Sequence, residues 1–199
     1  MLICTKKRIK LNKKLVRDKF FGLRHRLSES QNNYLSELVF QNLLSAFDFK
    51  GKTVALFLPI ISKKEVNTYS LIDHLEKHEV KWCIPSTCLK TWELTFFSIN
   101  DISNIQENKL GIPEAVNGQF IPASDIEVCI TPLLAHDLNG FRIGYGKGCY
   151  DRFFYTCNQN LIKIGITAFD QPINEVEIDD LDVRLDYCVT PFNIYEFQK

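Results

Sequence analysis

The stretch Gly144-Tyr-Gly-Lys-Gly-Cys-Tyr-Asp-Arg152 decides the fold, because it joins a predicted buried strand to a predicted helix. The strand covers residues 127–134, a largely apolar run, and the helix covers about 150–157. A strand, a glycine-rich loop and a helix in this order are typical of α/β proteins with a parallel sheet. Ligands of such sheets bind at the carboxyl ends of the strands, where this loop would lie. The stretch therefore predicts both a fold class and the place of a binding site.

The loop has the residue types of a phosphate site. Gly144, Gly146 and Gly148 allow a left-handed backbone and a close approach of the chain to a ligand. Lys147 can reach an anion, and the N-terminus of the following helix attracts phosphate. Asp151 follows where it could hold the Mg²⁺ that accompanies ATP. The alternative is a tight turn that needs glycine for its geometry alone.

Two common phosphate-binding motifs do not fit this loop. The Walker A motif requires a lysine followed by Ser or Thr, whereas Lys147 precedes Gly148. The dinucleotide fingerprint G-x-G-x-x-G spaces its glycines differently. The spacing therefore favours phosphate binding without assigning either motif.

Predicted strands and helices alternate along the rest of the chain. Helices are expected at about 12–26, from a capping box at Ser28 to about 47, and at about 68–78 after an Asn67 cap. Strands are expected at 54–58, 81–84, 94–98, 127–134, 161–168 and 187–190, the second ending at Pro85. This alternation predicts a layered α/β protein with a mostly parallel sheet.

Composition limits the classes of function. The chain has 199 residues, 45% of them hydrophobic, which suits a single domain over residues 1–199. Its formal net charge is zero, so nothing global indicates nucleic-acid binding. No apolar run is long enough to span a bilayer, and the N-terminus lacks the apolar segment of a signal peptide. Seven cysteines without a CxxC pair favour a reducing cytoplasm over a disulfide scaffold.

Opposite charges gather near the two ends of the chain. Lysines and arginines crowd residues 6–26 and are opposed there only by Asp18. Aspartates and glutamates crowd residues 170–186 and are opposed there only by Arg184. Two interpretations stay open: solvated faces that attract each other, or a basic wall for phosphates and an acidic wall for a cation.

A longer stretch around the loop resembles a known family. Residues 132–152, Pro132-Leu-Leu-Ala-His-Asp-Leu-Asn-Gly-Phe-Arg-Ile-Gly-Tyr-Gly-Lys-Gly-Cys-Tyr-Asp-Arg152, are similar to the signature of the 5-formyltetrahydrofolate cyclo-ligase family. Shorter matches follow in the family's order: Lys13-Lys-Leu-Val-Arg17, Phe57-Leu-Pro59, Glu65-Val-Asn-Thr68, Gly111-Ile-Pro-Glu114 and Asp182-Val-Arg-Leu-Asp186. The likeness spans nearly the whole chain, and the glycine loop is its most specific part.

The resemblance implies a fold and a reaction. The fold is a three-layer α/β/α sandwich with a mostly parallel sheet, Rossmann-like and similar to that of CoA transferases. The reaction converts 5-formyltetrahydrofolate and ATP to 5,10-methenyltetrahydrofolate, ADP and phosphate, and it requires Mg²⁺. Such phosphoryl transfer asks a protein mainly for positioning and charge stabilisation. We expect a cytoplasmic monomer or weak homodimer that acts on these small molecules, without a nucleic-acid or membrane partner.

The resemblance also implies roles for individual residues. Lys147 and Arg142 are the expected catalytic cations. ATP would contact Lys13, Arg17, Arg142, Ile143, Gly144, Tyr145, Gly146, Lys147, Gly148, Cys149 and Tyr150. The folate would contact Leu58, Glu65, Tyr145, Gly146, Lys147, Gly148 and Cys149. Asp151 and Asp182 would bind Mg²⁺.

Some of these residues have an ordinary structural alternative. Lys13 and Arg17 lie four residues apart and would share one helix face, which could simply be an exposed basic face. Glu65 could be a solvated loop acid that has no ligand. Asp182 could be a surface acid in an acidic stretch.

The chain departs from the family pattern at two positions in the signature. Cys149 stands where the family usually has Tyr or Phe, which removes an aromatic contact near the substrate. This change motivates an alternative function, a nucleotide-binding relative without folate turnover or with altered specificity. His136 stands where Phe is usual, and we expect a core histidine. We expect no metal site at His74 and His78, and Trp92 is expected to be a packing group.

Overall fold

The computed structural model describes residues 10–99 and 104–198, so Cys4, Lys6, Lys7 and Arg8 lie outside the described residues. The helices are α1 (Lys13–Arg26), α2 (Glu29–Ala46), α3 (Tyr69–Lys77) and α4 (Cys149–Thr156). The strands of the main sheet are β1 (Thr53–Ala55), β2 (Lys81–Thr87), β3 (Leu94–Ser98), β6 (Gln119–Ile121), β7 (Val128–Pro132), β10 (Ile162–Ile166), β11 (Tyr187–Val189) and β12 (Ile194–Glu196). Two small hairpins consist of β4 (Ile105–Glu107) with β5 (Pro113–Ala115), and of β8 (Ala135–His136) with β9 (Arg142–Ile143).

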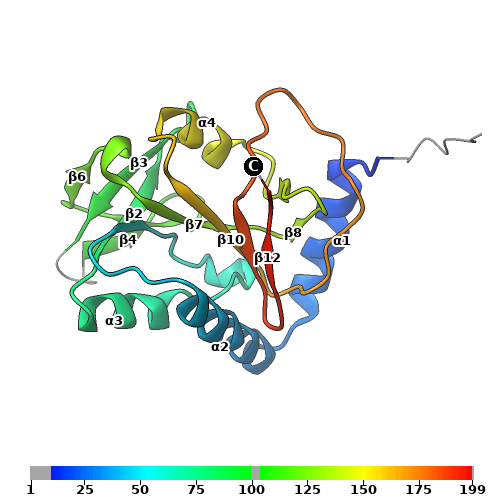
Figure 1. Ribbon diagram of the computed structural model, residues 1–199, viewed down its shortest axis with the longest axis horizontal. Helices are drawn as coiled ribbons and strands as arrows, with labels where there is room; N and C mark the ends of the chain where they lie inside the picture. The colour runs from blue at the N-terminus through cyan, green and yellow to red at the C-terminus, as the bar shows by residue number, and fades with distance from the viewer. Residues whose placement is uncertain (1–9, 100–103, 199) are drawn as a thin grey trace, which may run out of the picture.

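The eight-stranded sheet has the order β12-β11-β10-β7-β1-β2-β3-β6 (Figure 1). From β11 to β2 every neighbouring pair is parallel. The strands outside this block, β12 on one side and β3 and β6 on the other, pair antiparallel. The predicted mostly parallel sheet is therefore confirmed.

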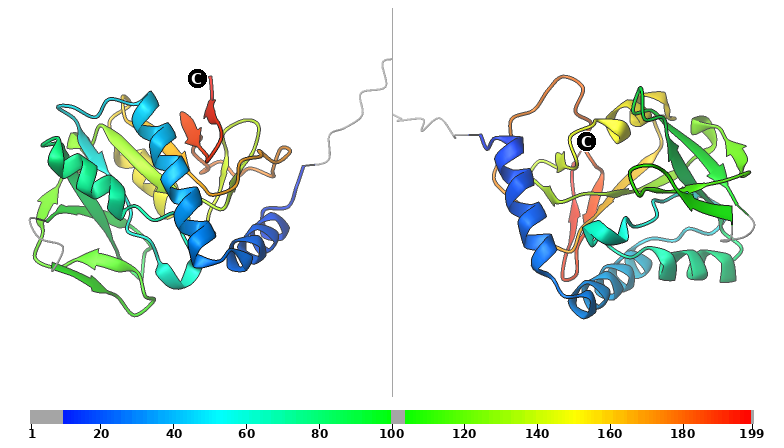
Figure 2. Two further views of the ribbon diagram at one scale, coloured as in Figure 1. Left: turned by 90° about the horizontal axis from the view of Figure 1, so that it is seen from below. Right: turned by 180° about the vertical axis from the view of Figure 1, so that it is seen from behind.

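Helices cover both faces of the sheet. α2 and α3 lie across one face, and α4 lies on the other, as the views in Figures 1 and 2 show. Alternate strand residues confirm the layers: Val54 packs in the cluster that holds Leu43 of α2, and Ala55 packs in the cluster that holds Phe153 of α4. The predicted three-layer α/β/α arrangement is confirmed. None of the described helices is both long and apolar enough to cross a membrane.

Side chains at the helix starts explain where the helices begin. The capping box at Ser28 is confirmed, since its Oγ accepts the Gln31 N–H at 3.1 Å and the Gln31 side chain accepts the Ser28 N–H at 2.8 Å. Asn67 Oδ1 accepts the Tyr69 N–H at 3.1 Å, so the predicted capping hydrogen bond of α3 is present. Thr68 lies directly before the helix, and its hydroxyl donates to the Phe57 carbonyl at 2.6 Å instead of capping.

The sheet differs from the prediction at Pro85 and at its edges. β2 continues through Pro85 to Thr87, although the proline was expected to end it. β1 pairs with β2 only as far as Cys83, so beyond that residue β2 has one neighbouring strand, β3. A strand with one free side tolerates a residue that lacks an N–H. The short antiparallel strands β6 and β12 were not predicted.

The two charged ends of the chain meet in the folded protein. Residues 170–186 pass beside the start of α1 (Figure 1). Leu11 pairs with Val176 in a parallel bridge, and Lys13 forms ion pairs with Asp179, at 3.5 Å, and with Asp182. The expected attraction between the two segments is therefore confirmed, but the Lys13 and Asp182 side chains are each only 20% exposed and are not the solvated faces of that interpretation.

Candidate functional site

A cavity of about 570 Å³ lies at the carboxyl ends of three parallel strands. Phe57 and Leu58, which follow β1, line it together with Thr87 at the end of β2 and Pro132 at the end of β7. This is the edge at which open α/β sheets bind their ligands. The cavity therefore lies where the strand–loop–helix order predicts a binding site.

All the predicted site residues line this one cavity. They are Lys13, Arg17, Leu58, Glu65, Arg142, Ile143, Gly144, Tyr145, Gly146, Lys147, Gly148, Cys149, Tyr150, Asp151 and Asp182. They come from α1, from the segment after β1, from β9 and the glycine loop, from the first turn of α4 and from the acidic segment. The fold thus brings residues from both ends of the chain to one place.

The glycine loop is shaped by its contact with α1. Gly146 and Gly148 have left-handed φ angles of +81° and +66°, whereas Gly144 does not have a positive φ, so the expectation for Gly144 was wrong. A Cβ on Gly146 would lie 2.7 Å from Nη2 of Arg17, so another residue here would displace the end of that side chain and would strain the left-handed backbone. Gly144 contributes its carbonyl instead, which accepts a hydrogen bond from Arg17 Nε at 2.9 Å.

The cationic side chains beside the loop differ in how firmly hydrogen bonds and burial fix their positions. The side chain of Arg142 is only 7% exposed, and its Nη1 donates to the Val183 carbonyl at 2.8 Å. Arg152 donates through Nη2 to the Lys147 carbonyl at 2.6 Å. The Lys147 side chain is exposed, with its Nζ 4.7 Å from the centroid of the Trp92 ring. Arg152 therefore fixes the loop and Arg142 is itself held in place, while the lysine can reach a ligand.

Both predicted metal ligands form ion pairs with predicted phosphate-binding cations. Oδ1 of Asp151 lies 2.7 Å from Nη2 of Arg142, and Asp182 pairs with Nζ of Lys13. Asp151 also accepts the backbone N–H of Val183 at 3.0 Å. Within residues 10–99 and 104–198, no three or more His, Cys, Asp or Glu side chains are grouped so that they could hold a metal ion.

Glu65 also lines the cavity and is buried, with 3% of its surface exposed. Its Oε2 accepts the Ile60 N–H at 2.7 Å, and its Oε1 accepts the Tyr145 hydroxyl at 2.6 Å. Burial raises the pKa of Glu65, and the positive charges of Arg24 and Lys63 oppose that shift. The burial is incompatible with the alternative of a solvated loop acid.

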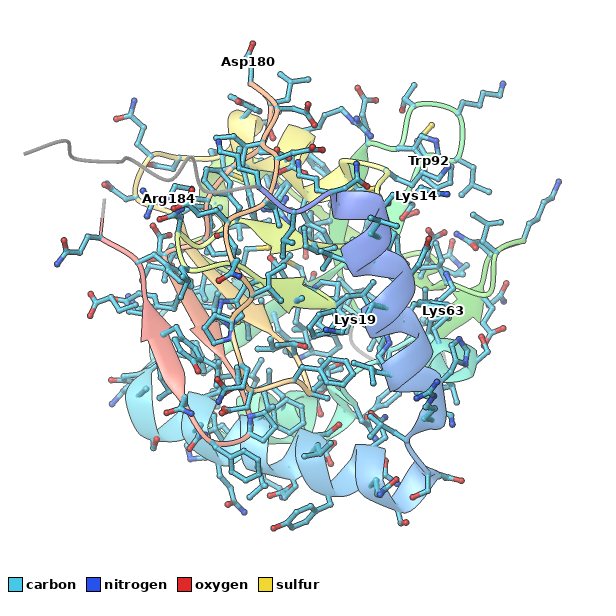
Figure 3. The ribbon with its side chains drawn as sticks, turned by 90° about the vertical axis from the view of Figure 1, so that its right-hand side faces the viewer. Lys14, Lys19, Lys63, Trp92, Asp180 and Arg184 are labelled. Carbon is cyan, nitrogen blue, oxygen red and sulfur yellow. The ribbon has the colours of Figure 1, made fainter. Side chains whose placement is uncertain are left out.

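Sequence reasoning missed part of the cavity wall. Lys63, Trp92 and Arg152 line it, and so does an apolar wall of Leu110, Ile112 and Pro113. In Figure 3, Trp92 and Lys63 both lie beside α1, with Trp92 nearer the start of the helix. Trp92, expected to be a packing group, is half-buried here. The match Gly111-Ile-Pro-Glu114 was the signal that could have placed the apolar wall.

The two departures from the family pattern lie in different surroundings. Cys149 is the first residue of α4 and is half-buried at the cavity; burial raises its thiol pKa, which disfavours a thiolate nucleophile. His136 is fully buried, with its ring centroid 4.8 Å from that of Tyr195, so the expected core histidine is confirmed. His74 and His78 stack on each other with ring centroids 4.1 Å apart. The described cysteines are all free.

Comparisons with known sequences agree with this geometry. Residues 9–191 match the 5-formyltetrahydrofolate cyclo-ligase family. The chain is 28% identical over 169 residues to the 5-formyltetrahydrofolate cyclo-ligase of Mycoplasma genitalium, covering 83% of this chain and 90% of that protein. It is 31% identical over 156 residues to a probable 5-formyltetrahydrofolate cyclo-ligase of Schizosaccharomyces pombe, covering 70% of this chain and 75% of that protein.

A solved structure has the same fold. The NMR structure of the 5,10-methenyltetrahydrofolate synthetase of Aquifex aeolicus superimposes with a TM-score of 0.79 and 31% sequence identity. The superposition covers 94% of this chain and 93% of that protein. The sequence match and the structural match therefore both extend over most of the chain. The chain belongs to the 5-formyltetrahydrofolate cyclo-ligase family.

Proposed function

We propose that this protein uses ATP to convert 5-formyltetrahydrofolate to 5,10-methenyltetrahydrofolate, with release of ADP and phosphate. The observation that carries the proposal is that every residue expected from the family signature lines one cavity at the carboxyl edge of the sheet. One part of this cavity, here called the phosphate end, is lined by several cations, and another part, the folate end, holds the buried carboxylate of Glu65 with Arg24 and Lys63 near it. These two chemistries suit a polyphosphate and a heterocycle with N–H groups.

The phosphate end of the cavity consists of Lys13, Arg17, Arg142 and Lys147. Arg142 supplies a fixed charge, and Lys147 supplies an exposed one that can follow the transferred phosphoryl group. The first turn of α4 adds backbone N–H groups, which have no partner within a helix. We assign the nucleotide phosphates to this end.

Asp151 and Asp182 would hold Mg²⁺ at the phosphate end. Mg²⁺ is usually bound by one or two carboxylates together with substrate phosphates and water, so two acids suffice. Their donor chemistry fits, and each already lies beside a cation that a phosphate would also contact. The metal would supply charge neutralisation between the phosphates.

The folate end consists of Leu58, Glu65 and Tyr145. Glu65 has one hydrogen bond to each oxygen, so a charged carboxylate retains lone pairs that can accept pterin N–H groups. Leu58 and the apolar wall opposite offer surfaces for a planar ring. We assign the pterin to this end, with its formyl group toward the phosphate end.

The bonds that change lie where the two ends meet. The formyl oxygen attacks the γ-phosphorus of ATP, and the bond from that phosphorus to ADP breaks. N10 then attacks the formyl carbon and loses its proton, and the carbon–oxygen bond breaks as phosphate leaves. Lys147 and Arg142 stabilise the charge on the phosphoryl group during the first step.

An absorbance assay tests the function. The purified full-length chain is mixed with 5-formyltetrahydrofolate, ATP and Mg²⁺, and the near-ultraviolet absorbance of methenyltetrahydrofolate is followed. We expect a rise that requires ATP and is absent without protein. No rise, with ATP still bound, would favour the alternative of a nucleotide-binding relative without folate turnover.

A further inference from the structure

Arg24 is a buried charge on α1 that the reaction does not account for. Its residue surface is 4% exposed, and arginines are rarely buried to this extent without a partner. Its guanidinium lies 5.8 Å from the centroid of the Phe21 ring, and its Nε has no hydrogen-bond partner. Burial of an incompletely paired charge costs stability, so its retention calls for another contribution.

Among the described residues, the guanidinium of Arg24 makes one hydrogen bond, and it leads to the folate end. Nη2 of Arg24 contacts the hydroxyl of Tyr145, and Tyr145 contacts Oε1 of Glu65 at 2.6 Å. Arginine can only donate, so the phenol oxygen accepts from Arg24 and its own proton points to Glu65. The chain of donors therefore runs from α1 through Tyr145 to the carboxylate.

This chain fixes the direction of the carboxylate. The Ile60 N–H holds Oε2 at 2.7 Å, and the Tyr145 hydroxyl holds Oε1. Arg17, seven residues before Arg24 on α1, holds the neighbouring loop carbonyl of Gly144 at 2.9 Å. One helix therefore positions two successive residues of the loop.

The charge of Arg24 also bears on the protonation of Glu65. The titratable groups that face Glu65 are Arg24 of α1, Lys63, Tyr145 and Tyr150. Burial raises the pKa of Glu65, and Arg24 is the largest opposing influence. A protonated Glu65 would present a donor in place of an acceptor. Without Arg24, the carboxyl would lose part of its ability to accept pterin N–H groups.

We infer that Arg24 is a positioning residue for folate recognition, which acts through the Tyr145 hydroxyl to hold Glu65 as a charged and oriented acceptor. The inference rests on the proposed function, because it assumes that the pterin binds at Glu65. It assigns no contact with substrate to Arg24 itself. It makes α1 a support of the folate end as well as a source of phosphate-end cations.

Calorimetric titration with 5-formyltetrahydrofolate, without ATP, tests the inference at mildly acid and mildly alkaline pH. We expect Arg24→Met to weaken folate binding about tenfold or more on the acid side, and to recover part of it as the pH rises and Glu65 ionises. Tyr145→Phe keeps the ring and should shift the profile in the same direction. Binding of ATP should stay within about twofold of wild type in both variants, because Arg24 is not assigned to ATP and Tyr145→Phe keeps the loop backbone and removes only the hydroxyl that contacts Arg24 and Glu65.

Matched variants separate positioning from a general loss of structure. Arg26→Met removes an exposed arginine from the same turn of α1 and should leave folate binding unchanged. If Arg24→Met does not fold, Tyr145→Phe carries the test. A folate affinity and pH profile like wild type in the folded variants would overturn the inference. So would equal weakening of folate and ATP without a change in the pH profile. A wild-type protein that binds no 5-formyltetrahydrofolate would instead overturn the proposed function, and this inference with it.

Discussion

The folate end and the phosphate end of the cavity are held by different kinds of contact. Glu65 is buried at the folate end, with both oxygens engaged by neutral N–H and O–H donors of the protein. At the phosphate end, Arg142 and Lys13 are paired with Asp151 and Asp182. Lys147 at this end is exposed. The carboxylate at the folate end is therefore oriented before any ligand binds. At the phosphate end, carboxylates of the protein itself neutralise the cations.

This difference follows from the ligands that each end would receive. A neutral heterocycle is recognised by the direction of its N–H groups, so an acceptor fixed in advance limits the loss of conformational entropy on binding. A polyphosphate with a metal brings both signs of charge, so it can replace both partners of an ion pair. We therefore expect the phosphate end to rearrange its pairs on binding and the folate end to stay as it is.

The variant Asp151→Asn should have the largest effect, because it removes a proposed metal ligand and leaves Arg142 without its partner. We expect turnover to fall roughly a thousandfold and the Mg²⁺ concentration for half-maximal rate to rise. Unfolding in urea should show a loss of about 3 kcal/mol, since a mostly buried pair is broken.

Asp180→Asn is the matched control, since Asp180 is exposed and extends from the acidic segment (Figure 3). It should change neither turnover nor the metal requirement. An unchanged metal requirement in Asp151→Asn would place the metal elsewhere and would weaken the contrast between the two ends.

The variant Lys147→Ala should act mainly on the phosphate end. Within the described part of the chain, the exposed ammonium forms no ion pair and contacts the Trp92 ring, so stability should hold. We expect kcat/KM for ATP to fall about a hundredfold, as for the loss of one charged transition-state contact, and folate binding, for which Lys147 is also an expected contact, to weaken less than this. Steady-state kinetics with each substrate varied in turn measures both.

Lys14→Ala provides the comparison, because Lys14 is an exposed lysine of α1 and does not line the cavity. A similar loss of ATP use in both variants would mean that only the general positive field matters. Full turnover in Lys147→Ala would remove its proposed role in phosphoryl transfer.

The sequence predicted the central strands and the place of the site, because these depend on local patterns. Apolar runs such as 127–134 need no tertiary information to be read as buried strands. The edge strands β6 and β12 are short and largely exposed, so they have no such run. Their pairing depends on the neighbours that the fold provides.

Site residues could be predicted where they lie in one contiguous motif. They could not be predicted where their role depends on burial and on contacts between distant parts of the chain. The glycine loop and its flanks carry their residues within one stretch, so each could be named. In the sequence, Arg24 is indistinguishable from the other cations of a basic helix. Its proposed role becomes visible only through its contact with Tyr145 in the folded protein. Likewise, the ion pairs of Asp151 and Asp182 join residues far apart in sequence, so no spacing could show them.

The variant Cys149→Tyr tests whether residue 149 contacts the folate or the nucleotide. Cys149 is half-buried at the start of α4, where the cavity has room for a ring. An added aromatic contact contributes about 0.5–1.5 kcal/mol, so we expect 5-formyltetrahydrofolate to bind two- to tenfold more tightly. ATP binding should not change. Calorimetry measures both, with Cys149→Ser as the control for loss of the thiol, and tighter binding of ATP alone would assign this residue to the phosphate end.

The smallest effect is expected at His136, which lies behind the phosphate end. His136 pairs with Arg142 across the β8–β9 hairpin, and its buried Nε2 has no hydrogen-bond partner. Burial lowers the pKa of His136 below its usual value of 6.5, and nearby Asp137 and Asp170 oppose the shift. The unfolded chain therefore binds more protons than the folded protein once the pH falls toward and below 6.5.

It follows that wild-type stability should fall as the pH drops through this range, and that His136→Phe should remove part of this loss. The difference in the free energy of unfolding should be about 1 kcal/mol at mildly acid pH and vanish at alkaline pH, apart from a constant offset for the new ring. Urea unfolding of both proteins at the two pH values measures it. The lowered pKa of His74 contributes to the pH dependence of both proteins and cancels in the difference.

Because the His136 ring packs against Tyr195 and Phe197 and not in the cavity, KM for either substrate should not change. An equal pH dependence in the two proteins would show that His136 has the same pKa in the folded and the unfolded state, so that its burial beside the hairpin does not make the support of the phosphate end sensitive to pH.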